Sequence, residues 1–228
     1  MKMLALLTFF LASTASAAER GYSVTDFDRI RVDGPYRVTL ATGRSPGARA
    51  FGSAGAIDAL SVEVQGRTLV IRRGGQAWGG YPGQAAGPVE LRLTGYGLRA
   101  AVLNGAGSLS VDRLRGQSID LAVSGSGLLT VGAVEADRLT LAVTGNGRMQ
   151  VAGKAATAWI AVRGTGAIDA RELLVKDAEV AADGPGDIAV AASGTAEVVS
   201  SGAGTVVVTG NVACTVKATG SGEVVCGR

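Results

Sequence analysis

Hydrophobic and polar residues alternate along most of the second half of the chain, and a Gly-x-Gly tripeptide interrupts the alternation at regular intervals. Seven such tripeptides follow one another, and their first glycines lie 18 to 20 residues apart. A fixed period of this length is typical of proteins built from stacked repeats. The turn glycines are Gly105, Gly107, Gly125, Gly127, Gly145, Gly147, Gly164, Gly166, Gly184, Gly186, Gly202, Gly204, Gly220 and Gly222.

Each repeat carries the same apolar positions around its first glycine. In the second repeat Leu121 and Val123 precede the glycine, Leu129 follows it, and the residue directly before the glycine, Ser124, is polar. This period-two pattern predicts two half-buried strands joined by a tight turn. Glycine suits the turn because the narrow end of the core leaves no room for a side chain, and because glycine accepts positive φ.

Each rung is therefore predicted to hold two strands of about five residues and a return turn of about five to seven residues. Stacking pairs every strand in parallel with its equivalent in the next rung, and seven rungs at ~4.8 Å would extend ~34 Å. The sequence predicts an all-β, right-handed parallel β-helix with rungs of 18–20 residues. The six-residue repeat of left-handed helices and the calcium-binding nonapeptide are both missing.

The segment 18–100 is less regular but also reads as strands. "FDRIRVDGPYRVTLATG" alternates, and "LSVEVQGRTLVIRR" alternates around a hairpin-like turn at Gln65 and Gly66. Residues 74–88 are rich in glycine and proline and are expected to form a loop. We interpret 18–100 as the starting rungs and cap of a single domain, 18–228, whose regular rungs occupy 101–228.

Residues 1–17 have the features of a secretory signal peptide: a positive charge at Lys2, a short apolar run and small residues before a cut after Ala17. The run is shorter than the roughly 20 apolar residues of a transmembrane helix, and no later segment is apolar enough to form one. We expect an exported protein, either periplasmic or at the cell surface. The 22 Lys and Arg and 19 Asp and Glu are scattered and aromatics make up 4% of the chain, which argues against nucleic-acid binding.

The chain resembles the bacterial family described as "putative auto-transporter adhesin, head GIN domain". The resemblance rests on the opening "FDRIRVDGPYRVTLATG", the "LSVEVQGRTLVI" hairpin and the run of Gly-x-Gly turns, and it covers nearly the whole segment after residue 17. It implies a β-helix related in shape to pectin lyases, without established catalytic residues, with a suggested role in adhesion as trimers. The chain ends at "VVCGR", so we do not expect it to transport itself across an outer membrane.

The chain contains no histidine. This excludes Ser-His-Asp and Cys-His nucleophiles, histidine bases and the common zinc sites, and we expect no catalytic residue, cofactor or metal. The alternative is a carbohydrate-active lyase or glycosidase that uses surface carboxylates, which must converge within about 10 Å. Its candidates are Asp120, Glu179 and Glu197 on one outward row, and Asp183 and Asp187, which flank one turn, with Asp169 one rung away.

Cys214 and Cys226 lie six positions before and after Gly220, where earlier rungs carry core pairs such as Ile119 with Val131. Two inward thiols in an exported protein favour a disulfide, with two buried free thiols as the alternative. The difficulty is distance, because packed sheets lie about 10 Å apart and a disulfide needs Cα atoms within about 7 Å.

The outer surface offers two candidate contacts. Trp78, Tyr81 and Trp159 could stack on sugars or pack against proteins, or could simply cover the first rungs. An outward row of small residues could receive a second copy or a partner, or could merely keep the sheet smooth. The row is Val102, Ala122, Ala142, Ala161, Ala181, Val199 and Lys217. We expect a non-enzymatic, adhesin-like binding or scaffold role toward an envelope protein or glycan.

Overall fold

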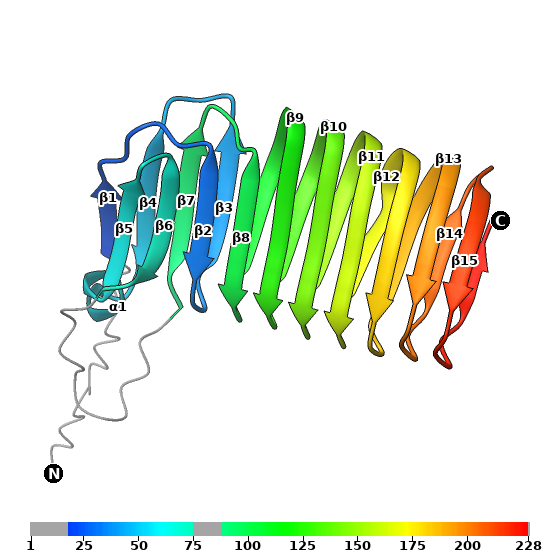
Figure 1. The fold of residues 1–228 in the computed structure, drawn as a ribbon. Coiled ribbons are helices and arrows are strands. Elements are labelled where there is room, and N and C mark those ends of the chain that lie inside the picture. Colours follow the sequence, from blue (N-terminus) through cyan, green and yellow to red (C-terminus); the bar gives the residue numbers. More distant parts are fainter. Residues whose placement is uncertain (1–17, 75–87, 228) are drawn as a thin grey trace, which may run out of the picture.

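The structure is a computed structural model that describes residues 18–74 and 88–227 (Figure 1). The predicted signal peptide and the loop residues Trp78 and Tyr81 lie outside the described residues. Apart from one short helix, the described chain consists of strands that wind into an elongated coil with the two ends at opposite ends of the rod (Figure 1). No helix in these two ranges is long and apolar enough to span a membrane.

The regular part of the coil is a stack of parallel strands, as predicted. Leu121 in one rung lies beside Leu141 in the next, and Leu141 lies beside Ile160. All three side chains are buried, because they occupy the apolar positions that the alternation turns inward. The strands are β8 (Ala100–Gly105), β9 (Ser108–Gly125), β10 (Leu128–Gly145), β11 (Arg148–Gly164), β12 (Ala167–Asp183), β13 (Asp187–Ser200), β14 (Val206–Thr209), β15 (Ala213–Ala218) and β16 (Val224–Cys226).

The prediction of two short strands with a return turn was wrong for the central rungs. Strands β9 to β13 run without a break for 14 to 18 residues, and pairing continues around the corner opposite the glycines. Inward residues fill this corner: Leu114, Val134 and Leu173 occupy equivalent positions and are buried, and β12 also buries Val175. Gly153 takes that place in β11, and β10 and β11 shift their register just before it. The register shift is needed because the rung from Gly145 to Gly164 has 19 residues, one fewer than the rung before it.

The chain reverses at the Gly-x-Gly tripeptides, which form the lower edge of the rod in Figure 1. The first glycines of five successive tripeptides have φ between 101° and 118°, a backbone conformation that residues with a side chain rarely adopt. The second glycines, such as Gly127, lie against the backbone of the rung before them. The first glycines of the last two tripeptides, Gly202 and Gly220, do not have positive φ.

The N-terminal segment continues the same two faces. β2 (Arg29–Asp33) and β3 (Arg37–Thr42) pair in parallel with β8 and β9. The predicted hairpin is present: β5 (Leu60–Gln65) and β6 (Thr68–Arg73) are antiparallel, and Gly66 has a φ of 62°. β6 extends the face of β2.

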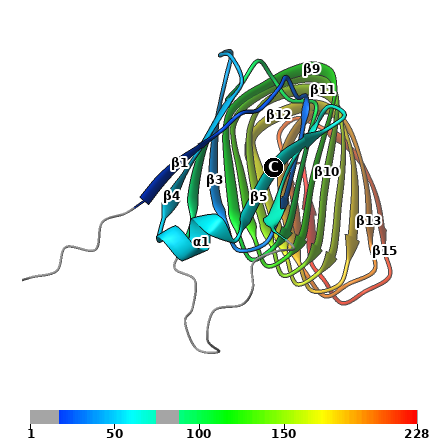
Figure 2. The same ribbon diagram turned by 90° about the vertical axis from the view of Figure 1, so that its left-hand side faces the viewer.

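Three elements at this end were not expected. β4 (Gly47–Gly52) is antiparallel to β7 (Glu90–Gly95), which itself runs parallel to β3. β1 (Ala18–Tyr22) adds to β4, also antiparallel. Helix α1 (Ala54–Asp58) is capped by the Ser53 side chain. Together with β5, the helix lies at the N-terminal end of the rod, and the rungs stack behind it (Figure 2).

The disulfide between Cys214 and Cys226 is formed, as the sequence favoured. Their Cα atoms lie 6.4 Å apart, so the distance objection does not hold at this end of the rod. Cys214 lies beside Ala196, and Cys226 lies beside Val208. The link therefore joins the two faces across the last described rung.

Candidate binding surface

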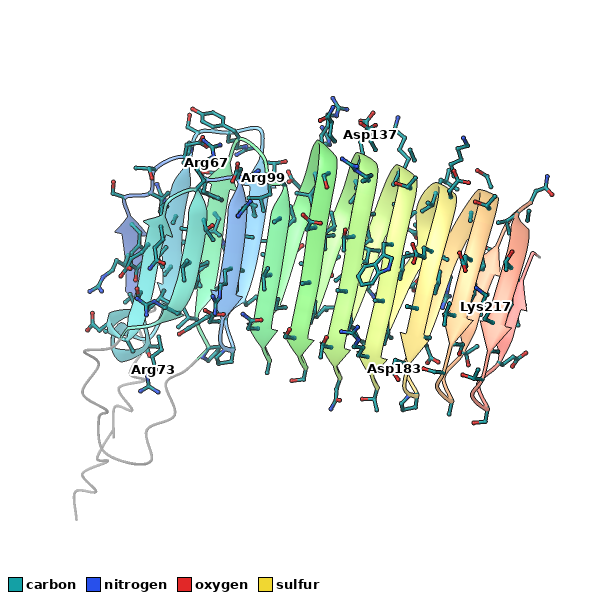
Figure 3. All side chains as sticks on the ribbon, in the orientation of Figure 1. Arg67, Arg73, Arg99, Asp137, Asp183 and Lys217 are labelled. Atoms are coloured by element: carbon teal, nitrogen blue, oxygen red, sulfur yellow. A yellow bond between two sulfur atoms is a disulfide. The ribbon has the colours of Figure 1, made fainter. Side chains whose placement is uncertain are left out.

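One face of the rod carries outward side chains in straight rows from rung to rung (Figure 3). We define the front face as β5, β6, β2, β8, the final parts of β9 to β13, and β15, which together face the viewer in Figure 1. The pairing register sets these rows, because each outward residue lies beside its equivalent in the next strand. The row that we call the Trp159 row is Asp120, Thr140, Trp159, Glu179, Glu197 and Thr215.

A second row, two residues earlier in each strand, runs beside the first. This Thr157 row is Arg138, Thr157, Asp177, Thr195 and Ala213. Between the two rows lies a groove of about 560 Å³. Its floor lies over Leu139, Ala158, Ala178 and Ala196, whose side chains are buried, and ends at Cys214, which is exposed. The groove therefore runs across the strands, along the rod axis, from β10 to β15.

Trp159 lies in this groove and is 38% exposed, although large aromatic side chains usually bury more of their surface. Its strand neighbour two residues on, Ala161, is nearly buried, and Ala142 and Ala181 flank Ala161 in the adjacent rungs. Because these side chains are small, the indole ring of Trp159 projects beyond the surface around it. The structure thus places one of the three predicted aromatic contacts in a groove, and the other two lie in the undescribed loop.

Two of the carboxylates in the groove are engaged by neighbours. Asp177 accepts hydrogen bonds from the Thr195 hydroxyl at 2.7 Å and from the Thr195 amide at 3.1 Å, and the hydroxyl bond lowers the pKa of Asp177. The Lys217 ammonium lies 3.1 Å from Glu197. Within the described part of the chain, the Glu179 carboxylate has no ion pair and no hydrogen-bond partner. It lies beside Trp159 and Glu197 in the row and remains available to a ligand.

Three of the other predicted carboxylates, Asp169, Asp183 and Asp187, each make a local contact. Asp187 accepts a hydrogen bond from the Thr205 amide at 2.9 Å, and Asp183 accepts one from Ser201. Asp169 is 3.5 Å from Arg171. Among the residues that the structure describes, no group of three potential ligands is placed to hold a metal ion.

The predicted row of small residues is straight and in register. Val102, Ala122, Ala142, Ala161 and Ala181 lie side by side in successive strands. The row continues to Val199, which is 44% exposed, and ends at Lys217, labelled in Figure 3. The front face is therefore flat and weakly apolar beside the groove.

Sequence reasoning missed an ionic cluster at the corner opposite the glycines. The Glu135 carboxylate lies between Arg115 at 2.5 Å and Lys154 at 3.1 Å, and hydrogen bonds from these two cations lower its pKa. The cluster borders a shallow depression close to Asp137, which is labelled on the upper edge in Figure 3. The repeat could have revealed it, because these residues lie about one period apart in the sequence.

A second ionic cluster joins the cap to the first rungs. Asp28 lies 2.9 Å from Arg67 and 3.0 Å from Arg99, two arginines that Figure 3 labels near the N-terminal end. Burial acts to raise the pKa of Asp28, but the hydrogen bond and charge of Arg67, with those of Arg99, outweigh it and lower the pKa. The cluster ties three separate segments together, so we assign it a structural role.

The rows and the groove define the class of this protein as an all-β solenoid that displays ordered side chains on flat outer faces. The family described as "Putative auto-transporter adhesin, head GIN domain" matches residues 26–212, and the chain belongs to this family. The resemblance noted in the sequence is thereby confirmed. No curated protein matches the chain.

Solved structures share the fold. A "putative adhesin" from Bacteroides fragilis NCTC 9343 has a TM-score of 0.82 and 18% identity, covering 94% of this chain and 98% of its own. A "putative adhesin" from Parabacteroides merdae ATCC 43184 has a TM-score of 0.70 and 18% identity, covering 91% and 95%. A "Putative lipid binding protein" from Parabacteroides distasonis ATCC 8503 has a TM-score of 0.71 and 20% identity, with the same coverages. At these identities the similarity shows the β-solenoid fold.

Proposed function

We propose that this protein is exported and acts without catalysis, as an adhesin-like protein that binds a component of the cell envelope through the outer surface of its solenoid. The observation that carries the proposal is the register of the front face, where outward residues repeat from rung to rung over a flat sheet. Such a surface holds many weak contacts in fixed positions, so little side-chain order is lost on binding.

Two further observations support binding rather than catalysis. The family is described by an adhesin role. Two of the three carboxylates in the groove are engaged in structural contacts, Asp177 with Thr195 and Glu197 with Lys217. The disulfide between Cys214 and Cys226 supports export, because disulfides persist in oxidising compartments.

The test uses purified residues 18–228 and envelope fragments from the producing cells. The labelled protein should cosediment with the fragments in a saturable way, and an excess of unlabelled protein should compete. A heat-unfolded sample of the same protein is the control for non-specific adsorption. In parallel, a protease added to intact cells should degrade the native protein if it is displayed on the surface. Absence of saturable binding would contradict the proposed function.

A further inference from the structure

We propose that the groove between the Trp159 row and the Thr157 row binds a neutral polysaccharide, with the sugar chain lying along the rod axis. This inference rests on the proposed function and names the class of ligand for one part of the surface. Three features of the groove lead to it: its shape, its mixture of an aromatic ring with hydroxyl and carboxylate groups, and its charge.

The shape of the groove suits a linear polymer. It crosses the five strands from β10 to β15, so it is roughly 19 Å long at ~4.8 Å per strand. Its volume of about 560 Å³ lies within the range of small-ligand sites. The units of an extended polysaccharide repeat at a distance close to the rung spacing. Successive sugars would therefore meet equivalent positions in successive rungs.

The side chains of the groove match the two kinds of surface on a sugar. The exposed indole of Trp159 offers a flat apolar face for the C–H face of a pyranose ring. Beside it, Glu179 can accept hydrogen bonds from sugar hydroxyls, and ionised acceptors form the stronger hydrogen bonds. The hydroxyls of Thr140 and Thr157 lie in the neighbouring positions of the two rows: the Thr140 hydroxyl can donate or accept, and the Thr157 hydroxyl, which donates to the Asp137 carbonyl oxygen at 3.1 Å, can accept.

The charge of the groove selects against acidic polymers. Asp177, Glu179 and Glu197 line it together with Arg138, and two further cations lie beside it, Lys217 next to Glu197 and Lys176 next to Asp177. Lys217 is already paired with Glu197. A polyuronate or a phosphate-rich polymer would bring further negative charge against Glu179, and like charges in contact oppose binding. A neutral glycan meets no such repulsion.

The experiment is affinity gel electrophoresis of residues 18–228, run toward the cathode because the protein is basic. Separate gels contain hydroxyethylcellulose, galactomannan, xylan, polygalacturonate or no polymer. We expect retardation by at least one neutral polymer and none by polygalacturonate. The Trp159→Ala variant should bind roughly tenfold more weakly, since one ring-stacking contact is lost, and Trp159→Phe should retain part of the affinity.

Two variants keep the test specific. Tyr96→Ala removes another exposed aromatic, outside the groove, and should bind like the unmodified protein. Glu179→Gln should weaken the retardation without shifting the thermal unfolding midpoint, because Glu179 has no partner in the described protein. Far-UV circular dichroism and the unfolding midpoint show that each variant is folded.

Three results would overturn the inference: no retardation by any of the neutral polymers, equal retardation of Trp159→Ala and the unmodified protein, or a preference for polygalacturonate. A fourth is tight binding of a polylysine peptide in competition with the neutral polymer, which would indicate a cationic protein segment as the occupant. If the protein still cosediments with envelope fragments but shows one of these results, the glycan inference fails and the proposed function stands. If cosedimentation is absent as well, both fail.

Discussion

Two glycines of the same strand allow a direct test of why the chain reverses where it does. Gly125 ends β9 with a φ of 112°, and a Cβ atom placed on it would lie 2.8 Å from the Gly105 carbonyl oxygen. Gly116, in the middle of β9, has no positive φ, and its nearest neighbours would lie 3.9 Å from an added Cβ. Substituting each glycine with alanine therefore adds the same methyl group in two different environments.

The expected costs differ in sign. For Gly125→Ala, a left-handed backbone costs roughly 1–2 kcal/mol, and the contact with the neighbouring backbone adds about 1–3 kcal/mol of overpacking. The neighbour cannot move away freely, because Gly105 and Gly125 are paired and Gly145 pairs on the other side. The sum is about 2–5 kcal/mol of destabilisation. For Gly116→Ala, the less flexible unfolded chain gives about 0.4–1 kcal/mol of stabilisation.

The assay is thermal unfolding combined with hydrogen–deuterium exchange. At about 2–4 °C per kcal/mol for a domain of this size, Gly125→Ala should lower the midpoint by roughly 4–20 °C. Exchange should rise first in the peptides of β9 and β10 around the corner, because repeat proteins respond locally. Gly116→Ala should leave the midpoint unchanged or raise it slightly. If the two variants are equally stable, the steric account of the glycine corner is wrong.

Replacing both Cys214 and Cys226 with serine should remove about 3 kcal/mol from the stability of the last rung, the loop-closure entropy of a link of 12 residues; faster exchange confined to β15 and β16 would show it. Leu141→Ala, at a fully buried core position, should cost about 2–5 kcal/mol, measured as a lower urea midpoint. Burial acts to raise the pKa of Asp112, but hydrogen bonds from the Thr42 amide and hydroxyl outweigh it and lower the pKa. The stability due to Asp112 is therefore full above its unfolded pKa of about 3.9 and is lost as the pH falls through the lower folded value. Asp112→Asn should be less stable at pH 7 and should lose less stability between pH 5 and pH 2, as followed by the thermal midpoint.

The stacked rungs could be predicted from the sequence because one period fixes both the inward positions and the register. Leu121, Leu141 and Ile160 recur at equivalent places, and the structure stacks and buries them. The structure of the corner opposite the glycines could not be predicted in the same way. There the alternation gives way to charged residues around few inward side chains, such as Leu114 in β9, so the segment resembled a loop although its backbone keeps the parallel pairing.

The N-terminal cap lay beyond this reasoning for a different reason. Its strands pair with partners that are distant in sequence and in both directions, as when Ala48 of β4 meets Leu93 of β7. No repeat fixes such pairs, and helix α1, with five residues, is too short to show a helical period. Alternation alone therefore predicted strands in this segment but not their order.

The candidate binding surface was also predicted only in part. The period placed Trp159 and Glu179 on one outward row in neighbouring rungs, and the structure confirms that they lie side by side. That a groove separates this row from the Thr157 row depends on the local shape of the sheet, which the alternation does not encode. The residues that line the groove were therefore not predicted. Nor were the contacts of Asp177 with Thr195 and of Glu197 with Lys217, which make Glu179 the carboxylate in the groove that is available to a ligand.

The repeat pattern explains why the disulfide can form although typical sheet spacing argues against it. A typical sheet spacing of about 10 Å argued against the link, but the equivalent core residues become smaller toward the C-terminal end, from Leu139 to Ala158 and Ala196. Smaller core residues let the two faces approach, and Cys214 and Cys226 lie at a Cα distance of 6.4 Å. Every residue of β15 is exposed, and within the described ranges no strand pairs with its outer edge. The link therefore holds the two faces together in the rung where core packing contributes least.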